Sequence, residues 1–427
     1  MIISVVLTIL LIISLAVNFH FASNNGAENK TETYTQTVDS TQTLIEPQTF
    51  TLNHNETSTA TSTVMSTVTL VQNSLTTTPS QLSIGNIAVA RIMVGMFPDR
   101  IAVDSKTDRV FVPYYNGANM SLAVIDGETN SVIANVSSIS TYEGYFPVVD
   151  SNTDMIYYGN AVINGSTNKI VDLLNPNITF IAVDESNNLV FAANQTSTVS
   201  PATELYEING TDDAIVSSVA SSGELSLGAG AVGEASLNPL THVLYVAACF
   251  GNDECFTSGI LAINDTNLKV ISEIPINQII FSVVADSASN LVFVTAAQSQ
   301  LYVINGTTNS IANVETVTAY ANQLRSVTIA PGSGEPLSGE LIMTGSPVCN
   351  GIGGPNLINC DGNNTIYVIS TFNYGLFATF VSNNDTFGGL TYVAYDSANN
   401  ETYASFDFSN FVLALKIPQY SATMLLP

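Results

Sequence analysis

Short apolar runs alternate with polar turns along most of the chain, and the alternation itself repeats. One motif reads SLAVIDGETNSVIANV from Ser121 and returns as AVINGSTNKIVDL from Ala161, YEINGTDDAIVSSV from Tyr206, LAINDTNLKVISEI from Leu261 and YVINGTTNSIANV from Tyr302. A second motif precedes each copy: two apolar runs around a turn rich in Asp, Asn and Ser. Such a repeat is one supersecondary unit that buries its apolar faces only by stacking on copies of itself.

The composition of both motifs predicts strands joined by tight turns. The apolar runs are short and rich in Val, Ile, Tyr and Phe, which favour β-strands. In one motif the turn opens with an Asp whose side chain can accept a hydrogen bond from the backbone two residues on. These residues are Asp104, Asp150, Asp184, Asp286 and Asp396. In the other motif we expect the turn glycines to supply a positive φ. These are Gly127, Gly165, Gly210 and Gly306.

Each unit therefore predicts a four-stranded antiparallel blade, and one turn marker can be counted for each blade. The markers are Asp104, Asp150, Asp184, Asn238, Asp286, Ala330 and Asp396. Their spacing of roughly 49 residues is typical of β-propeller blades. Seven markers predict an all-β, seven-bladed propeller; six or eight blades stay open, because the sixth unit is irregular and carries the largest insertion. Residues 86–94 are expected to supply the last blade's fourth strand and so close the ring.

These motifs resemble the YVTN family of β-propeller repeats, whose unit runs as a V-Y-V-x-N strand followed by V-x-V-I-D-G-x-T-N. The nearest copy is LAVIDGETNSVIANV from Leu122, and the resemblance extends over residues 86–417. It implies the propeller fold and an exported or surface-associated protein, and it carries no catalytic residue. The chain departs from the pattern where the second strand loses its terminal Asn, as in VLYVAA and LVFVTAA.

The N-terminal part divides into two further regions. Residues 1–22 begin with a long uncharged apolar run and are expected to be a cleaved signal peptide or a retained membrane anchor. Residues 23–83 are expected to be a stalk or a plain linker, because Ser and Thr fill 23 of the positions from 31 to 80. The propeller domain is then expected to occupy residues 84–427.

Sequons and cysteines also point to an extracellular or cell-surface location. Thirteen Asn-x-Ser/Thr sequons predict a glycoprotein. They lie at Asn29, Asn55, Asn119, Asn135, Asn164, Asn177, Asn194, Asn209, Asn264, Asn305, Asn363, Asn384 and Asn400. The four cysteines form two local pairs, Cys249–Cys255 and Cys349–Cys360, and predict two disulfides. The alternative, a structural zinc site, has unsuitable spacings, and we interpret His242, the propeller's one histidine, as a packing or surface residue.

Both cysteine pairs fall in long loops between the second and third strands of a blade. These loops emerge on the same side of the ring as the connections between blades, which we call the loop face. A bridge that pins a long loop lowers the entropy lost when the loop contacts a partner. We therefore expect the loop face to be the binding face; the alternative is that the bridges only stabilise the loops.

Charge limits the classes of partner. The chain holds 35 acidic and nine basic side chains, with a pI near 4.1, which argues against nucleic acid and anionic membranes. Few charges and many neutral polar side chains suit an acidic medium. Arg100 and Glu234 share a register near the predicted channel mouth and Arg325 is one residue off, so they could bind a carboxylate or sulfate group. The alternative is a structural ion pair.

No nucleophile, phosphate-binding or metalloprotease motif is present, and no cofactor is expected. We expect a non-enzymatic adhesion, interaction or cell-envelope (filament-decorating) module that holds a protein or glycan partner. The alternative is an extracellular propeller hydrolase or lyase that acts on a sugar or lactone with acidic channel residues. Carboxylates converging in a pocket favour the enzyme, whereas an exposed apolar or aromatic patch favours the binder.

Overall fold

The chain divides into two units, Met1–Thr78 and Pro79–Pro427, each considered by itself. The computed structural model describes residues 17–18, 33–34, 48–53, 59–64, 82–84, 87–137, 139, 147–194, 204–220, 235–249, 258–317, 322–331, 339–350, 359–361, 364–371, 374, 376–381, 389–406 and 408–418. The proposed signal or anchor, apart from Val17–Asn18, and the C-terminal tail from residue 419 lie outside these ranges. Within them, no helix has the length and hydropathy needed to cross a membrane.

The first unit contains two short antiparallel pairs. Strand β1 (Val17–Asn18) pairs with β2 (Thr33–Tyr34), and β3 (Gln48–Asn53) pairs with β4 (Thr59–Val64). The second pair lies in the Ser/Thr-rich region, where the sequence predicted no strand.

The second unit is a seven-bladed β-propeller, and the blades have the predicted four-stranded antiparallel order. Blade 1 comprises β7 (Ala102–Asp104), β8 (Arg109–Tyr115), β9 (Met120–Asp126) and β10 (Ser131–Val136). Blade 2 comprises β11 (Val148–Asp150), β12 (Met155–Tyr158), β13 (Ala161–Asn164) and β14 (Lys169–Leu173). Blade 3 comprises β15 (Ile178–Asp184), β16 (Leu189–Asn194), β17 (Glu204–Asn209) and β18 (Ile215–Ala220).

The remaining blades continue the pattern. Blade 4 comprises β19 (Ala235–Asn238), β20 (Val243–Cys249), β21 (Ser258–Asn264) and β22 (Val270–Pro275). Blade 5 comprises β23 (Ile280–Asp286), β24 (Leu291–Ala296), β25 (Gln300–Asn305) and β26 (Ser310–Thr316). Blade 6 comprises β27 (Asn322–Ala330), β28 (Glu340–Asn350), β30 (Thr365–Ser370) and β31 (Leu376–Val381). Blade 7 comprises β32 (Leu390–Asp396), β33 (Glu401–Phe406), β34 (Phe411–Leu415) and β6 (Ala88–Met93).

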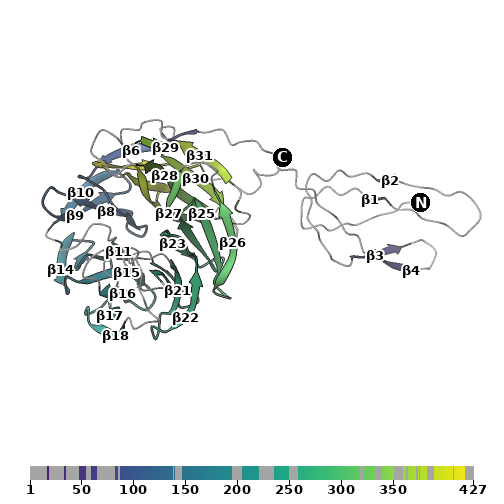
Figure 1. The fold of residues 1–427 in the computed structure, drawn as a ribbon, viewed down its shortest axis with the longest axis horizontal. Coiled ribbons are helices and arrows are strands. Elements are labelled where there is room, and N and C mark those ends of the chain that lie inside the picture. The colour runs from purple at the N-terminus through teal and green to yellow at the C-terminus, as the bar shows by residue number, and fades with distance from the viewer. Residues whose placement is uncertain are drawn as a thin grey trace, which may run out of the picture. The chain divides into compact units, whose positions relative to one another are not determined.

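The first strand of every blade contacts the first strands of both neighbouring blades, so these strands form the inner ring. Figure 1 shows β11, β15, β23 and β27 near the centre and β14, β18, β22 and β26 at the rim. The predicted closure is confirmed: β6 pairs antiparallel with β34, with Met93 opposite Phe411 and Ile92 opposite Val412. A strand from before the first blade therefore completes the last one.

Blade 6 is larger than the sequence predicted. Its sheet carries two additional strands, β29 (Asn359–Asp361) against β28 and β5 (Leu82–Ser83) in parallel against β31. Strand β5 belongs to the segment that the sequence assigned to the stalk. The open edge of β31 is thus covered by the chain itself.

The core lies between the blades. Tyr157 of blade 2 packs on Phe180 of blade 3 with ring centroids 5.1 Å apart, and both side chains are buried. At the closure, Val112 of blade 1 shares a cluster with Tyr403 and Val412 of blade 7. Each sheet therefore buries its faces against the next sheets, as the repeat required.

The first-motif turns form as predicted. The backbone N–H two residues on donates to the side chain of each Asp marker, from Lys106 to Asp104 at 3.0 Å and from Ala398 to Asp396 at 2.9 Å. In blade 4, Leu240 N donates in the same way to Asn238 Oδ1 at 3.1 Å. These hairpins, together with those between third and fourth strands, emerge on the side opposite the loop face, which we call the hairpin face.

The expected role of the second-motif glycines was wrong. Gly127, Gly165, Gly210 and Gly306 do not have positive φ; the left-handed conformation falls on Asn and Asp residues nearby. A Cβ at Gly210 would lie 2.2 Å from Asn188 Oδ1, and one at Gly127 would lie 1.9 Å from Asp108 Oδ1. Glycine is required because another hairpin's side chain lies directly over the position.

Candidate functional site

The loop face carries an exposed group of large apolar side chains where blade 7 meets blade 1. Phe97 lies between Tyr115 and Phe408, with ring centroids 6.5 and 5.8 Å apart, the second pair in an edge-to-face arrangement. Phe408 is 77% exposed and Phe97 is 44% exposed. Met96, 43% exposed, lies next to Phe97. We call Met96, Phe97, Tyr115 and Phe408 the aromatic patch.

Backbone hydrogen bonds hold the aromatic patch between the two blades. Met96 N donates to Tyr115 O at 3.2 Å, and Tyr115 N donates to Met96 O at 2.7 Å. On the other side, Phe97 N donates to Ser409 O at 2.9 Å. The segment that leads from β6 to β7 is thus bound both to blade 1 and to the β33–β34 loop of blade 7. The patch has a fixed backbone on which to present its rings.

Both exposed phenylalanines have strained backbones. Phe97 has φ of 54° and Phe408 has φ of 61°. A bulky residue with positive φ is an outlier that costs about 1–3 kcal/mol and persists where the surroundings impose it. Such strain gathers at functional sites, which makes this pair the most informative feature of the loop face.

The two arginines predicted as ligand residues lie between inner strands. The Arg100 guanidinium lies 4.9 Å from the Tyr392 ring centroid on β32, and that of Arg325 lies 4.9 Å from the Phe281 ring centroid on β23. In both cases the arginine stacks on an aromatic ring of the preceding blade, a cation–π contact. The inner strand of blade 7 separates them, so they do not form one site. Glu234 lies outside the described residues.

The backbone sets Cys349 directly opposite Cys360 across the β28–β29 pair. Opposed Cα atoms in antiparallel strands are about 4.5–5.5 Å apart, within the range that a disulfide bridges. Cys249 ends β20 opposite Ser258, and Cys255 lies outside the described residues. Both disulfides stay predictions.

Four sequon asparagines have a structural role on the hairpin face. The side-chain oxygens of Asn209, Asn264 and Asn305 accept hydrogen bonds from the backbone N–H two residues on, and that of Asn164 accepts from Thr167 N. The turn chemistry alone therefore accounts for these asparagines. Asn119, Asn135, Asn177, Asn194 and Asn400 are also described, whereas Asn29, Asn55, Asn363 and Asn384 lie outside the described residues. Glycosylation stays a prediction at every one.

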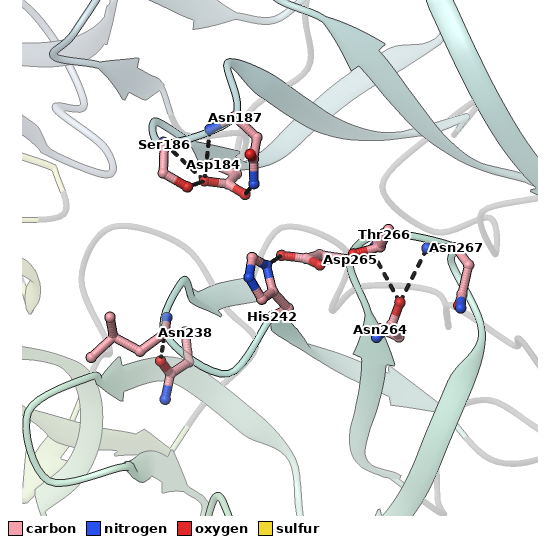
Figure 2. Close-up of polar contacts among 10 residues, drawn as sticks. Asp184, Ser186, Asn187, Asn238, His242, Asn264, Asp265, Thr266 and Asn267 are labelled. Carbon is pink, nitrogen blue, oxygen red and sulfur yellow. Dashed lines mark hydrogen bonds and ion pairs between the residues drawn. The ribbon is translucent and has the colours of Figure 1, made fainter.

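The hairpin face carries a cluster that was not predicted from the sequence, which we call the Asp–His–Asp cluster: Asp184, His242 and Asp265. Ligand atoms of the three side chains lie within 4.8 Å of one another. Figure 2 shows them converging from separate turns, with Asp184 from blade 3 and the other two from blade 4. His242 Nδ1 is 3.1 Å from Asp265 Oδ2. One sequence signal was present: Asp265 stands where four other repeats have glycine.

No protein-family model matches the chain, and no curated protein sequence matches it. The likeness to YVTN repeats therefore rests on the repeat residues themselves. What the sequence and the structure together establish is a seven-bladed β-propeller.

Proposed function

We propose that this chain is a non-enzymatic, YVTN-like surface protein that holds a protein or glycan partner through the aromatic patch. The patch lies on the loop face, where the sequence analysis expected binding. Exposed apolar groups with a polar surround are typical of interaction sites, and aromatic side chains and Met are enriched in the cores of such sites.

The observation that carries the proposal is the contact between Phe97 and Phe408. Each ring is exposed and each backbone is strained, so neither residue gains full burial in return for the cost of its conformation. A stability role alone is better served by Asn or Gly at these positions, because both adopt positive φ readily. A partner that buries the rings supplies the missing gain.

The same proposal gives the N-terminal regions a role in export and attachment. Residues 1–22 direct the chain out of the cell or anchor it, the Ser/Thr-rich region that precedes β5 acts as a stalk, and glycans cover the sequons. An adhesive or envelope-decorating role follows from this arrangement.

The structure offers less support for the enzyme alternative. The acidic markers at the ends of the inner strands accept hydrogen bonds within their own turns, as Asp104 does from Lys106 and Asp150 does from Asn152. At Asp104 and Asp150 the turn itself accounts for the carboxylate.

Binding to washed envelopes of the producing cells tests the proposal. The variant F97N+F408N is expected to lower the amount of purified protein retained by at least about tenfold. The matched control is L240A, which truncates a 73% exposed leucine on the hairpin face and is expected to bind like the wild type. Equal retention of the double variant and the wild type would contradict the proposal, and a glycosidase-treated envelope separates glycan from protein partners.

A further inference from the structure

The hairpins of blades 1, 2, 3 and 5 share one backbone contact, and blade 4 makes it with different residues. In each of those four blades a glycine N–H donates to the carbonyl of an Asp or Asn that has positive φ, at 2.8–2.9 Å. The pairs are Gly127–Asp108, Gly165–Asp154, Gly210–Asn188 and Gly306–Asn290. In blade 4 the same contact joins Asp265 N to His242 O at 3.2 Å.

In blade 4, Asp265 therefore replaces the glycine and His242 replaces the Asp or Asn. In the other four blades the Asp or Asn side chain lies over the glycine, and an added Cβ would come within 1.9–2.2 Å of it. Asp265 carries a side chain at this position, and its Oδ2 lies 3.1 Å from His242 Nδ1. His242 has φ of 56°, a conformation that His adopts more readily than most residues. Since Gly with Asp or Asn suffices for the turn, the His–Asp pair requires a further reason.

Asp184 approaches this pair from the neighbouring blade with its carboxylate fixed. Ser186 N and Oγ donate to Oδ1 at 2.9 and 2.6 Å, and Asn187 Nδ2 donates to Oδ2 at 2.7 Å. Figure 2 shows these contacts around Asp184, with His242 and Asp265 next to each other below it. Hydrogen bonds from outside a site that fix a carboxylate ligand are typical of metal centres.

The cluster also concentrates buried negative charge. Asp184 is 0% exposed and Asp265 is 2% exposed. Within the described part of the chain, their hydrogen-bond and ion-pair partners are Ser186, Asn187, His242 and Thr266, of which only His242 can carry positive charge. Burial and the charge of Asp265 raise the pKa of nearby Glu207, a sign that negative charge accumulates here. Buried charges of this kind are normally paired or bound to a metal.

We propose that Asp184, His242 and Asp265 bind one divalent transition-metal cation of the zinc class, which cross-links blades 3 and 4. An imidazole with two carboxylates suits Zn²⁺, whereas Ca²⁺ and Mg²⁺ take oxygen ligands. The His242 side chain is 50% exposed, so water can complete the coordination. This site lies on the hairpin face and is independent of the aromatic patch on the loop face.

Zinc titration of the full chain tests the proposal. The chain is freed of metal with a chelator and titrated with Zn²⁺ by calorimetry, and thermal unfolding is followed with and without the ion. The test variant is H242N+D265G, which restores the pair found in blades 3 and 5, Asn188 with Gly210 and Asn290 with Gly306. It is expected to fold and to lose both the zinc-dependent rise in unfolding temperature and at least about tenfold in affinity.

Two controls separate other outcomes. The variant keeps His20 and His54, so zinc bound there is the same in both proteins. The single variant D265G removes one ligand without adding a side chain and is expected to lose zinc affinity as well. The proposal is overturned if the wild type shows no zinc-dependent stabilisation, if H242N+D265G binds zinc as tightly as the wild type, or if Ca²⁺ stabilises more than Zn²⁺. The F97N+F408N variant is expected to bind zinc normally.

Discussion

Asp108 of blade 1 and Asp396 of blade 7 face each other across the junction that closes the ring, close enough for their carboxyl groups to share a hydrogen bond. Asp396 is fully buried, and its Oδ2 meets no donor group among the described residues. Asn399 Nδ2 donates to Asp108 Oδ1 at 3.1 Å. A protonated Asp108 can donate a hydrogen bond to Asp396, so the junction favours the protonated form of Asp108.

This pairing predicts that the propeller is more stable in mild acid than at neutral pH. Burial, the hydrogen bond to Asp396 and the charges of Asp396, Asp126 and Glu128 raise the pKa of Asp108 to about 6. Burial and the charges of Asp172 and Asp212 raise the pKa of Asp213 to about 6 as well. The folded state therefore binds protons more tightly than the unfolded state, and the free energy of unfolding falls as pH rises through 6.

Other carboxyl groups set the lower pH limit of the range in which the propeller is most stable. Hydrogen bonds from Thr129 lower the pKa of Asp126. At Asp184 burial acts to raise the pKa, but hydrogen bonds from Ser186 and Asn187 outweigh it and lower the pKa. Their contribution is lost as pH falls below about 4. Chemical denaturation from pH 3 to 8 is expected to show maximal stability between about pH 4 and 6; a maximum at pH 7 or above contradicts the prediction.

The variant D108N tests the closing pair directly. Asn occupies the equivalent position in blades 3 and 5, as Asn188 and Asn290, and its amide can donate to Asp396 without a shared proton. At pH 7.5 the variant is expected to raise the free energy of unfolding by up to about 1 kcal/mol. At pH 4.5 it is expected to match the wild type. A loss of stability at pH 7.5 would show that the pair is not under repulsion there.

Because β6 closes the ring, we expect truncation of its buried side chains to lower the stability of the propeller strongly. Ile92 is 4% exposed, and I92A is expected to lower the free energy of unfolding by about 2–5 kcal/mol because it leaves a cavity between blades 7 and 1. V89A is the matched control on the same strand, since Val89 is 51% exposed and alternates to the outer side. It is expected to change stability by less than about 0.5 kcal/mol. Similar losses in both variants contradict the closure.

The aromatic patch predicts that its phenylalanines can be removed without loss of stability. F97N and F408N each relieve a strained backbone, so each is expected to lower the free energy of unfolding by no more than about 0.5 kcal/mol, or to raise it. Thermal and denaturant unfolding measure this directly. A loss above about 2 kcal/mol in either variant means that the ring stabilises the fold and removes the main argument for a binding role.

The hairpin glycines predict effects of different size for alanine at equivalent positions. In G306A the new Cβ meets Asn290 Oδ1 at 2.2 Å, and overpacking of this kind costs about 1–3 kcal/mol. D265A is the matched control, because His242 leaves room for a side chain there. In chelator it is expected to lose less than about 1 kcal/mol. Equal losses in the two variants contradict the steric explanation.

The propeller could be predicted from the repeat because the contacts that specify its strands and turns lie between residues close together in the sequence. The Asp104 and Asp184 turns form between residues two or three positions apart, and strand length, turn chemistry and blade number follow from such contacts along the sequence. The closing strand β6 could also be predicted, because it was a fourth strand that lacked a blade. Strand β5 could not, because its parallel pairing with β31 leaves no periodic signal in two residues.

Only the tertiary structure decided which side chains meet across the blades. Phe97 joins Phe408, Asp108 joins Asp396 and Asp184 joins His242 through contacts between segments far apart in the chain, and these depend on how each blade is turned against the next. The glycine prediction failed because of a contact within one blade: the restriction at Gly210 comes from the side chain of Asn188 in another hairpin of blade 3 and not from its own backbone. The local sequence pattern specifies the strands and turns of each blade, whereas the orientation of adjacent blades decides which side chains come together in a site.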